Sequence, residues 1–159
     1  MIQVRYVKEC PLRDAGPSWL LLIHQLPAKP AYARVKVWRR LQALGAVTVK
    51  NAVYALPVHG DAREDFAWLA KEIEELGGEA IVCEAALVEG LTDAALKDLF
   101  DAARDEDYGR IAEEARQIAE RIAGDASDSV LAEAVSQTAR LRRQLDAVDR
   151  KSTRLNSSH

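Results

Sequence analysis

The 159-residue sequence predicts an α+β fold, with a small sheet domain over residues 19–90 and a helical extension over residues 91–148. Three observations lead to this expectation. Apolar runs of strand length alternate with amphipathic segments in the first half of the chain. After Thr92, the apolar residues recur at helical spacings alone. Proline and glycine residues separate most of the segments, as is typical of turns between elements.

The positions of proline and glycine define the first predicted elements. Pro11, Gly16 and Pro17 interrupt residues 1–18, which we expect to form a flexible leader. The apolar run of residues 19–26 has the length of a strand and the composition of one that is buried on both faces. A helix is predicted over residues 31–44, because Pro30 precedes it and Gly45 stands at the position that favours a left-handed cap.

Helical periodicity divides residues 31–44 into an apolar and a basic face. The apolar arc contains Val35, Val37, Trp38, Leu41 and Leu44, and the opposite arc contains Lys36, Arg39 and Arg40. Arg34 lies within the apolar arc. Its aliphatic stem can extend along that surface to a carboxylate, or its guanidinium can contact an oxyanion or a phosphate.

Three more elements complete the predicted sheet domain. Residues 46–49 and 52–56 form a hairpin around Asn51, residues 63–76 form a helix capped by Asp61, and residues 80–87 form the last strand. The order β-α-β-β-α-β is that of a ferredoxin-like domain, in which two helices cover one face of a four-stranded antiparallel sheet.

The extension is predicted to be a helical hairpin. Thr92 or Asp93 can cap its first helix, Gly109 marks a kink or break, and residues 124–129 form the loop. The final helix, over residues 129–148, carries an apolar stripe made of Leu131, Val135, Thr138, Leu141, Leu145 and Val148. The domain or a second copy of the chain is needed to bury the stripes of both helices.

Residues 149–159 resemble one translated reading frame of a common sequencing adapter. We therefore expect them to be read-through sequence, and they supply no candidate site residue.

Charge is unevenly distributed along the chain. Residues 15–60 contain six basic residues and no acidic one, whereas residues 61–148 contain ten basic and 22 acidic residues. A basic surface favours polyanions or oxyanions. Alternatively, the basic segment pairs with the acidic half inside the fold. The candidate DNA-phosphate ligands are Lys29, Lys36, Arg39, Arg40 and Lys50, together with Arg142 and Arg143 from the last helix.

No motif of a catalytic, metal or cofactor site is recognisable, so we expect neither an enzyme nor a bound cofactor. Cys10 and Cys83 stand apart, and no secretory signal or stretch long enough to span a membrane is visible. These features predict a cytoplasmic protein with no membrane partner. His24 is expected to be a hydrogen-bonded core residue.

The segments Trp19–Pro27, 33–41, 44–47 and Val53–Pro57 closely resemble the N-terminal region of the ChrB family of chromate resistance proteins. The resemblance extends more weakly through Phe100, Tyr108 and residues 140–143, and covers most of residues 19–148. It implies a cytoplasmic regulator of chromate efflux genes that binds operator DNA and releases it when chromate enters. Family members normally carry a second, C-terminal domain, and we expect this chain to end before it.

The pattern also resembles the ferredoxin-like domain of PaaX-type repressors and of the small CRISPR-associated nucleases. In those nucleases an aspartate at the end of the first strand binds metal. Here His24, Gln25 and Leu26 occupy that place, which argues against nuclease activity.

The leading hypothesis is a DNA-binding module of a chromate-responsive transcription factor, with an uncompensated cationic face around residues 31–44. A second hypothesis is a dimerisation or sensor module, a possible homodimer, that leaves DNA binding to another part of the protein. A third is direct capture of chromate or a sulfate-like oxyanion by Arg34 beside Lys36 and Arg40.

Overall fold

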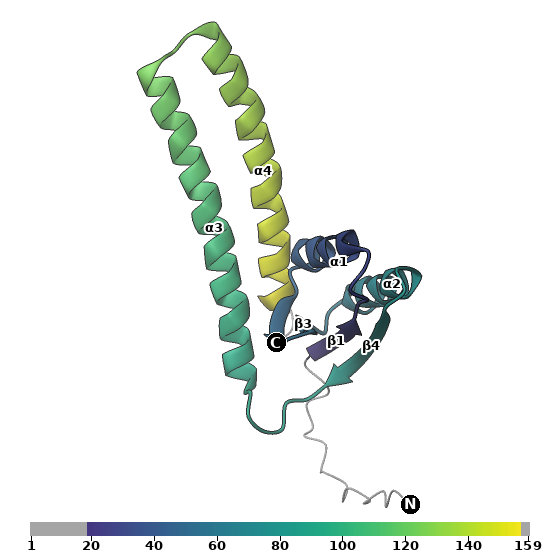
Figure 1. Ribbon diagram of the computed structural model, residues 1–159. Coiled ribbons are helices and arrows are strands. Elements are labelled where there is room, and N and C mark those ends of the chain that lie inside the picture. The colour runs from purple at the N-terminus through teal and green to yellow at the C-terminus, as the bar shows by residue number, and fades with distance from the viewer. Residues whose placement is uncertain (1–18, 157–159) are drawn as a thin grey trace, which may run out of the picture.

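The computed structural model describes residues 19–156, so the leader expected over residues 1–18 lies outside the described residues (Figure 1). The described part of the chain is an α+β structure with a four-stranded antiparallel sheet and four helices. In chain order its elements are β1 (Trp19–Gln25), α1 (Ala31–Leu44), β2 (Val47–Lys50), β3 (Val53–Pro57), α2 (Ala62–Glu75), β4 (Glu79–Ala85), α3 (Asp93–Gly124) and α4 (Asp128–Asn156).

The sheet has the strand order β2-β3-β1-β4. β1 pairs antiparallel with both of its neighbours, so that Leu22 stands opposite Tyr54 on β3 and Val82 on β4. The β2–β3 hairpin turns at Asn51, which adopts a positive φ of 47° as the sequence predicts for this turn.

The main core lies between the sheet and the two helices that cover one of its faces, α1 and α2 (Figure 1). Leu20 and Leu22 point from β1 into this layer, because alternate residues of a strand face the same side. The helices contribute Val37, Leu41, Phe66, Leu69 and Ile73, all of which are almost fully buried.

The opposite sheet face is only partly covered. Trp19 stacks on Phe100 at the start of α3, with ring centroids 5.6 Å apart, and its indole nitrogen donates a hydrogen bond to Asp93 at 2.7 Å. Farther along this face, Ile23 and Ile81 remain exposed at 40% and 62%. The expectation that β1 is buried on both faces is therefore correct for its first residues alone.

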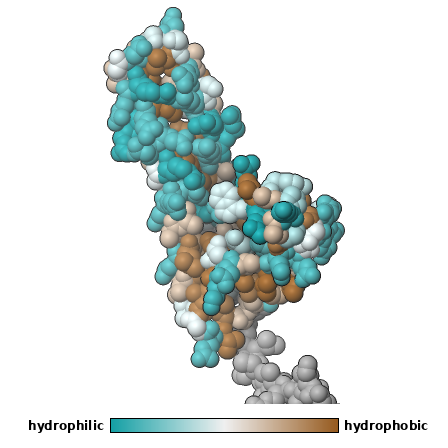
Figure 2. Space-filling model, viewed as in Figure 1, coloured by the Kyte–Doolittle hydropathy of each residue, from teal (hydrophilic) through white to brown (hydrophobic). Residues whose placement is uncertain are grey.

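Helices α3 and α4 lie side by side and extend well beyond the sheet domain (Figure 1). Ile118, Ala134 and Leu141 form a small core between them. In the view of Figure 2, hydrophilic residues cover most of the far part of this pair, and hydrophobic residues gather around the sheet and the start of α3.

Three local predictions have different outcomes. Thr92 caps α3 as expected, since its hydroxyl accepts a hydrogen bond from the backbone of Ala95 at 3.1 Å. Asp61 makes no capping hydrogen bond through its side chain. The break expected at Gly109 is wrong, because α3 continues through it from Asp93 to Gly124.

Candidate nucleic-acid interface

Helix α1 positions three of the candidate phosphate ligands. Its buried residues Ala33, Val37 and Leu41 recur every four positions and fix which side meets the sheet. Lys36, Arg39 and Arg40 consequently point away from the core and are exposed. The sequence predicts this division correctly for the basic residues.

The apolar arc of α1 is narrower than expected. Val35 is 47% exposed and Trp38 is 54% exposed, so the prediction that both face the core is wrong. The buried strip of α1, made of residues four apart, is enough to cover β1. The flanks of the helix therefore remain exposed to solvent.

A shallow groove of about 670 Å³ runs over the outer side of α1. Its lining residues are Tyr32, Val35, Lys36, Arg39, Arg40, Ala43 and Glu72. The groove therefore combines three cations with the exposed ring of Tyr32, and one carboxylate stands among them.

That carboxylate belongs to α2 and partly neutralises the groove. Lys36 Nζ lies 2.8 Å from one Glu72 oxygen, and Arg40 Nε lies 3.8 Å from the other. The hydrogen bond and the charge of Glu72 both raise the pKa of Lys36, which keeps this amine protonated. The expectation of an uncompensated cationic face thus fails at Lys36 and Arg40, which share one acidic partner.

The remaining candidates are not drawn into ion pairs. Lys29 precedes α1, Lys50 ends β2, and both are exposed. Neither they nor Arg39 form a salt bridge with any described residue, so their charges are available to a ligand. Arg142 and Arg143 are also exposed, but they lie on α4 and outside the groove.

Arg34 lines a separate hollow of about 390 Å³, between α1 and the end of β1. The hollow is also lined by His24, Gln25, Leu26, Val37, Trp38, Leu41, Ala52 and Tyr54. It contains no carboxylate. Because Lys36 and Arg40 line the other groove, the expectation that these two stand beside Arg34 is wrong.

His24 forms the inner wall of this hollow. Its ring stacks on Tyr54 with centroids 5.6 Å apart, and neither ring nitrogen has a hydrogen-bond partner among the described residues. Burial lowers the pKa of His24, which favours the neutral imidazole at pH 7. The expectation of a hydrogen-bonded core histidine is therefore not met.

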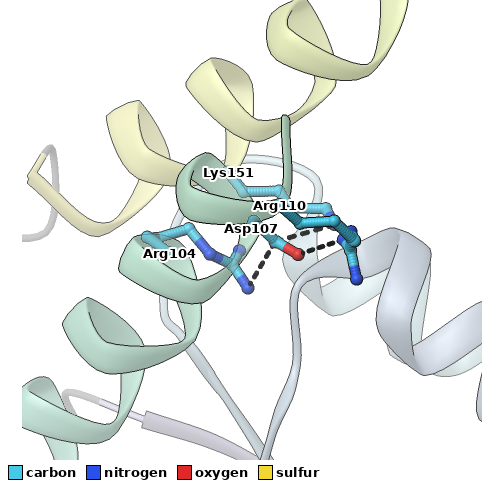
Figure 3. A network of polar contacts seen from close by, with 4 residues as sticks. All are labelled: Arg104, Asp107, Arg110 and Lys151. Atoms are coloured by element: carbon cyan, nitrogen blue, oxygen red, sulfur yellow. Dashed lines mark hydrogen bonds and ion pairs between the residues drawn. The ribbon is translucent and has the colours of Figure 1, made fainter. Parts of the chain in front are cut away.

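A polar network that the sequence did not reveal holds the base of the helical extension (Figure 3). Asp107 on α3 lies 3.5 Å from buried Arg104, 2.7 Å from Arg110 and 4.0 Å from Lys151 on α4. Burial lowers the pKa of Lys151. One pattern in the sequence could have indicated that Arg104 is buried. It follows Leu96 and Phe100, which are also buried, at intervals of four residues.

The described residues contain no group of three or more histidine, cysteine, aspartate and glutamate side chains able to hold a metal ion. None of the helices within residues 19–156 combines the length and apolarity needed to cross a membrane.

The family described as "Protein ChrB, N-terminal" matches residues 34–153 of the sequence. The chain belongs to this ChrB N-terminal family. A curated relative, Protein ChrB of Cupriavidus metallidurans, is 30% identical over 84 residues, which are 53% of this chain. The matched region spans 26% of that relative's length. No solved structure matches the chain significantly.

Proposed function

We propose that this chain is the DNA-binding, regulatory module of a chromate-sensing transcriptional regulator that controls chromate efflux genes. The observation that carries the proposal is the groove over α1, where Arg39 has no ion-pair partner among the described residues and Lys36 and Arg40 share one carboxylate. Membership of the ChrB N-terminal family supports a part in chromate resistance.

In this proposal the cations contact the phosphate backbone of operator DNA. Lysine and arginine side chains release condensed counterions when they neutralise phosphates, which gives affinity without regard to sequence. Arg39, Lys29 and Lys50 supply the free charges, and Lys36 and Arg40 join when a phosphate displaces Glu72. Arg142 and Arg143 offer further contacts from α4. Chromate entry is expected to release the DNA.

We further propose that residues 19–90 form a ferredoxin-like domain and that α3 and α4 form a helical hairpin attached to it. The element order and the pairing of β1 with both β3 and β4 support this classification. The module is proposed to act in the cytoplasm and to have no catalytic activity.

The experiment is fluorescence anisotropy of the 159-residue chain with two labelled duplexes, one from the DNA upstream of its own gene and one scrambled. Arg39→Gln should weaken binding of both duplexes by a similar factor, because a phosphate contact is independent of sequence. Arg116→Gln is the matched control, since Arg116 is an exposed arginine on α3 that already pairs with Glu113. Equal effects of the two substitutions would refute the assignment.

A second candidate function is oxyanion sensing in the hollow beside β1. The observation that favours it is Arg34, which makes no ion pair with a described residue and lines a hollow that lacks carboxylates. A guanidinium can present two parallel N–H donors to a tetrahedral dianion such as chromate or sulfate.

Calorimetric titration with chromate and with sulfate tests this candidate. Binding heat should disappear in Arg34→Ala and persist in Arg39→Ala, because Arg39 lines the other groove. An absence of binding heat in the unsubstituted chain, or its retention in Arg34→Ala, removes Arg34 as an oxyanion ligand.

A further inference from the structure

The hollow between α1 and the end of β1 is walled mostly by aromatic and aliphatic side chains. Val37 and Leu41, both almost fully buried, contribute from α1. On the sheet side, Tyr54 stacks on His24 with the two rings 15° from parallel. The volume of about 390 Å³ is within the range of small-ligand sites, which are largely apolar and contain a few polar groups. These walls suit a ligand with flat, apolar faces.

Trp38 provides an open aromatic surface at the same hollow. Its side chain lines the hollow and is 54% exposed. Within residues 19–156 it stacks on no other ring, whereas Trp19 stacks on Phe100. An exposed indole of this kind is a surface on which a nucleobase can stack, and such stacking contributes affinity whichever base is bound.

Arg34 supplies the polar group of the hollow. It lies one helical turn before Trp38, so the two side chains are on the same side of α1. Its guanidinium forms no hydrogen bond or ion pair with a described residue. All the lining residues come from residues 15–60, a segment without an acidic residue. The donors of Arg34 are therefore available to a ligand that presents adjacent acceptors.

A guanine base complements both of these features. Its faces are flat, and its N7 and O6 atoms are the adjacent acceptors that arginine contacts through two hydrogen bonds. Cytosine instead presents an amino donor, whose usual partner is a carboxylate, and no carboxylate lines the hollow. A tetrahedral oxyanion can contact Arg34 but has no flat face to place against Trp38.

We propose that the hollow binds one unpaired guanine of DNA, with the base stacked on Trp38 and its N7 and O6 atoms accepting hydrogen bonds from Arg34. The inference rests on the proposed DNA-binding function. Trp38 directly precedes Arg39, so a strand whose phosphates contact Arg39 lies near the hollow. Removing a base from the stack costs free energy, and the cost is lowest for a base without a pairing partner. The chain should therefore prefer DNA that carries an unpaired guanine.

Fluorescence anisotropy of the 159-residue chain with three labelled duplexes tests the inference. The duplexes share one sequence: the first is fully paired, the second carries one additional unpaired guanine at its centre, and the third carries an unpaired thymine there. The duplex with unpaired guanine should bind about 5-fold or more tightly than the paired one. Arg34→Gln should abolish the preference for unpaired guanine over unpaired thymine, because the two hydrogen bonds to N7 and O6 are lost.

Trp38→Leu should reduce the affinity for the duplex with unpaired guanine to that for the paired duplex. Trp68→Leu is the matched control, because Trp68 is a tryptophan on α2 that is 67% exposed and lies outside the hollow. It should leave the preference unchanged. Circular dichroism should show the same helix content in both variants, since both positions are exposed to solvent.

The possible results separate this inference from the proposed function. Equal affinity for the three duplexes, or a preference for unpaired guanine that persists in Trp38→Leu, overturns the inference and leaves DNA binding in place. Failure to bind any of the duplexes overturns both. Calorimetric titration with guanosine monophosphate distinguishes the two sources of the base. If this nucleotide binds as tightly as the duplex with unpaired guanine, the ligand is a free nucleotide and the assignment to DNA is wrong.

Discussion

His24 is a titratable side chain held in the hollow between α1 and the end of β1. Burial lowers its pKa in the folded protein below the ordinary value of about 6.5. As the pH falls through 6.5, the unfolded chain therefore binds more protons at His24 than the folded protein does. The unfolding free energy is consequently highest above this pH, as far as His24 contributes to it, and declines below it.

Replacing His24 by phenylalanine should reduce this decline. The aromatic ring can still stack on Tyr54, while the titrating group is removed. Urea unfolding of both proteins at several pH values between about 5.5 and 7.5 measures the effect. An identical pH dependence in the two proteins contradicts the account, because the other titratable groups are common to both.

Asp107 is the carboxylate that balances three cations at the base of α3 and α4 (Figure 3). Asp107→Asn should lower the unfolding free energy by about 1–3 kcal/mol, because buried Arg104 loses its charged partner. Asp98→Asn on the same helix is the control, since Asp98 is exposed and forms no ion pair with the described residues. Equal denaturation midpoints for the two variants would show that the network contributes nothing.

At the scale of the element, α1 ends where the sequence predicts because Gly45 adopts a φ of 77°. A Cβ atom there would meet Arg104 and Lys151 at 2.8–3.1 Å. Gly45→Ala should therefore destabilise the protein by about 1–2 kcal/mol, from the left-handed backbone and the crowding together.

Gly109→Ala is the opposite case on α3. Gly109 lies inside a continuous helix, and nothing lies within 4 Å of the position that a Cβ atom would take. The substitution should stabilise the protein by about 0.5–1 kcal/mol, because alanine favours a helix interior over glycine. Thermal unfolding of both variants checks the pair, and a destabilising Gly109→Ala would indicate that α3 does break there.

Element bounds were predictable from the sequence because proline and glycine mark them. The range 31–44 predicted for α1 is the range observed. The orientation of its flanks was not predictable, because whether Trp38 meets the core depends on how many apolar residues the sheet can accept. Gly109 shows that a glycine does not always end an element. The free-energy cost of one glycine in a helix is small compared with the stabilisation from the packing of the residues around it.

At the scale of the whole molecule, the sequence predicts where basic residues concentrate but not which of them are neutralised. Glu72 is far from Lys36 in the sequence. The two side chains form an ion pair only because α1 and α2 pack against the same sheet face. The separation of Arg34 from Lys36 and Arg40 likewise depends on which side of α1 meets the sheet.

Removal of the shared carboxylate should strengthen DNA binding. Glu72→Gln leaves Lys36 and Arg40 without their partner, so both can neutralise phosphates. The measurement is anisotropy with the upstream duplex at fixed salt, and Glu74→Gln is the control because Glu74 is exposed on the same helix outside the groove. If Glu72→Gln binds no more tightly than Glu74→Gln, the groove over α1 is not the site of contact.

The central claim is that free cations around α1 neutralise DNA phosphates, and the salt dependence of binding tests it most directly. The observed affinity of the unsubstituted chain should fall as salt rises, with a slope of about 0.9 per phosphate on logarithmic axes. Joint replacement of Lys29, Arg39 and Lys50 by glutamine should lower that slope by about 2.7. A slope that stays the same after the three replacements, or an affinity that is flat from low to moderate salt, contradicts the claim.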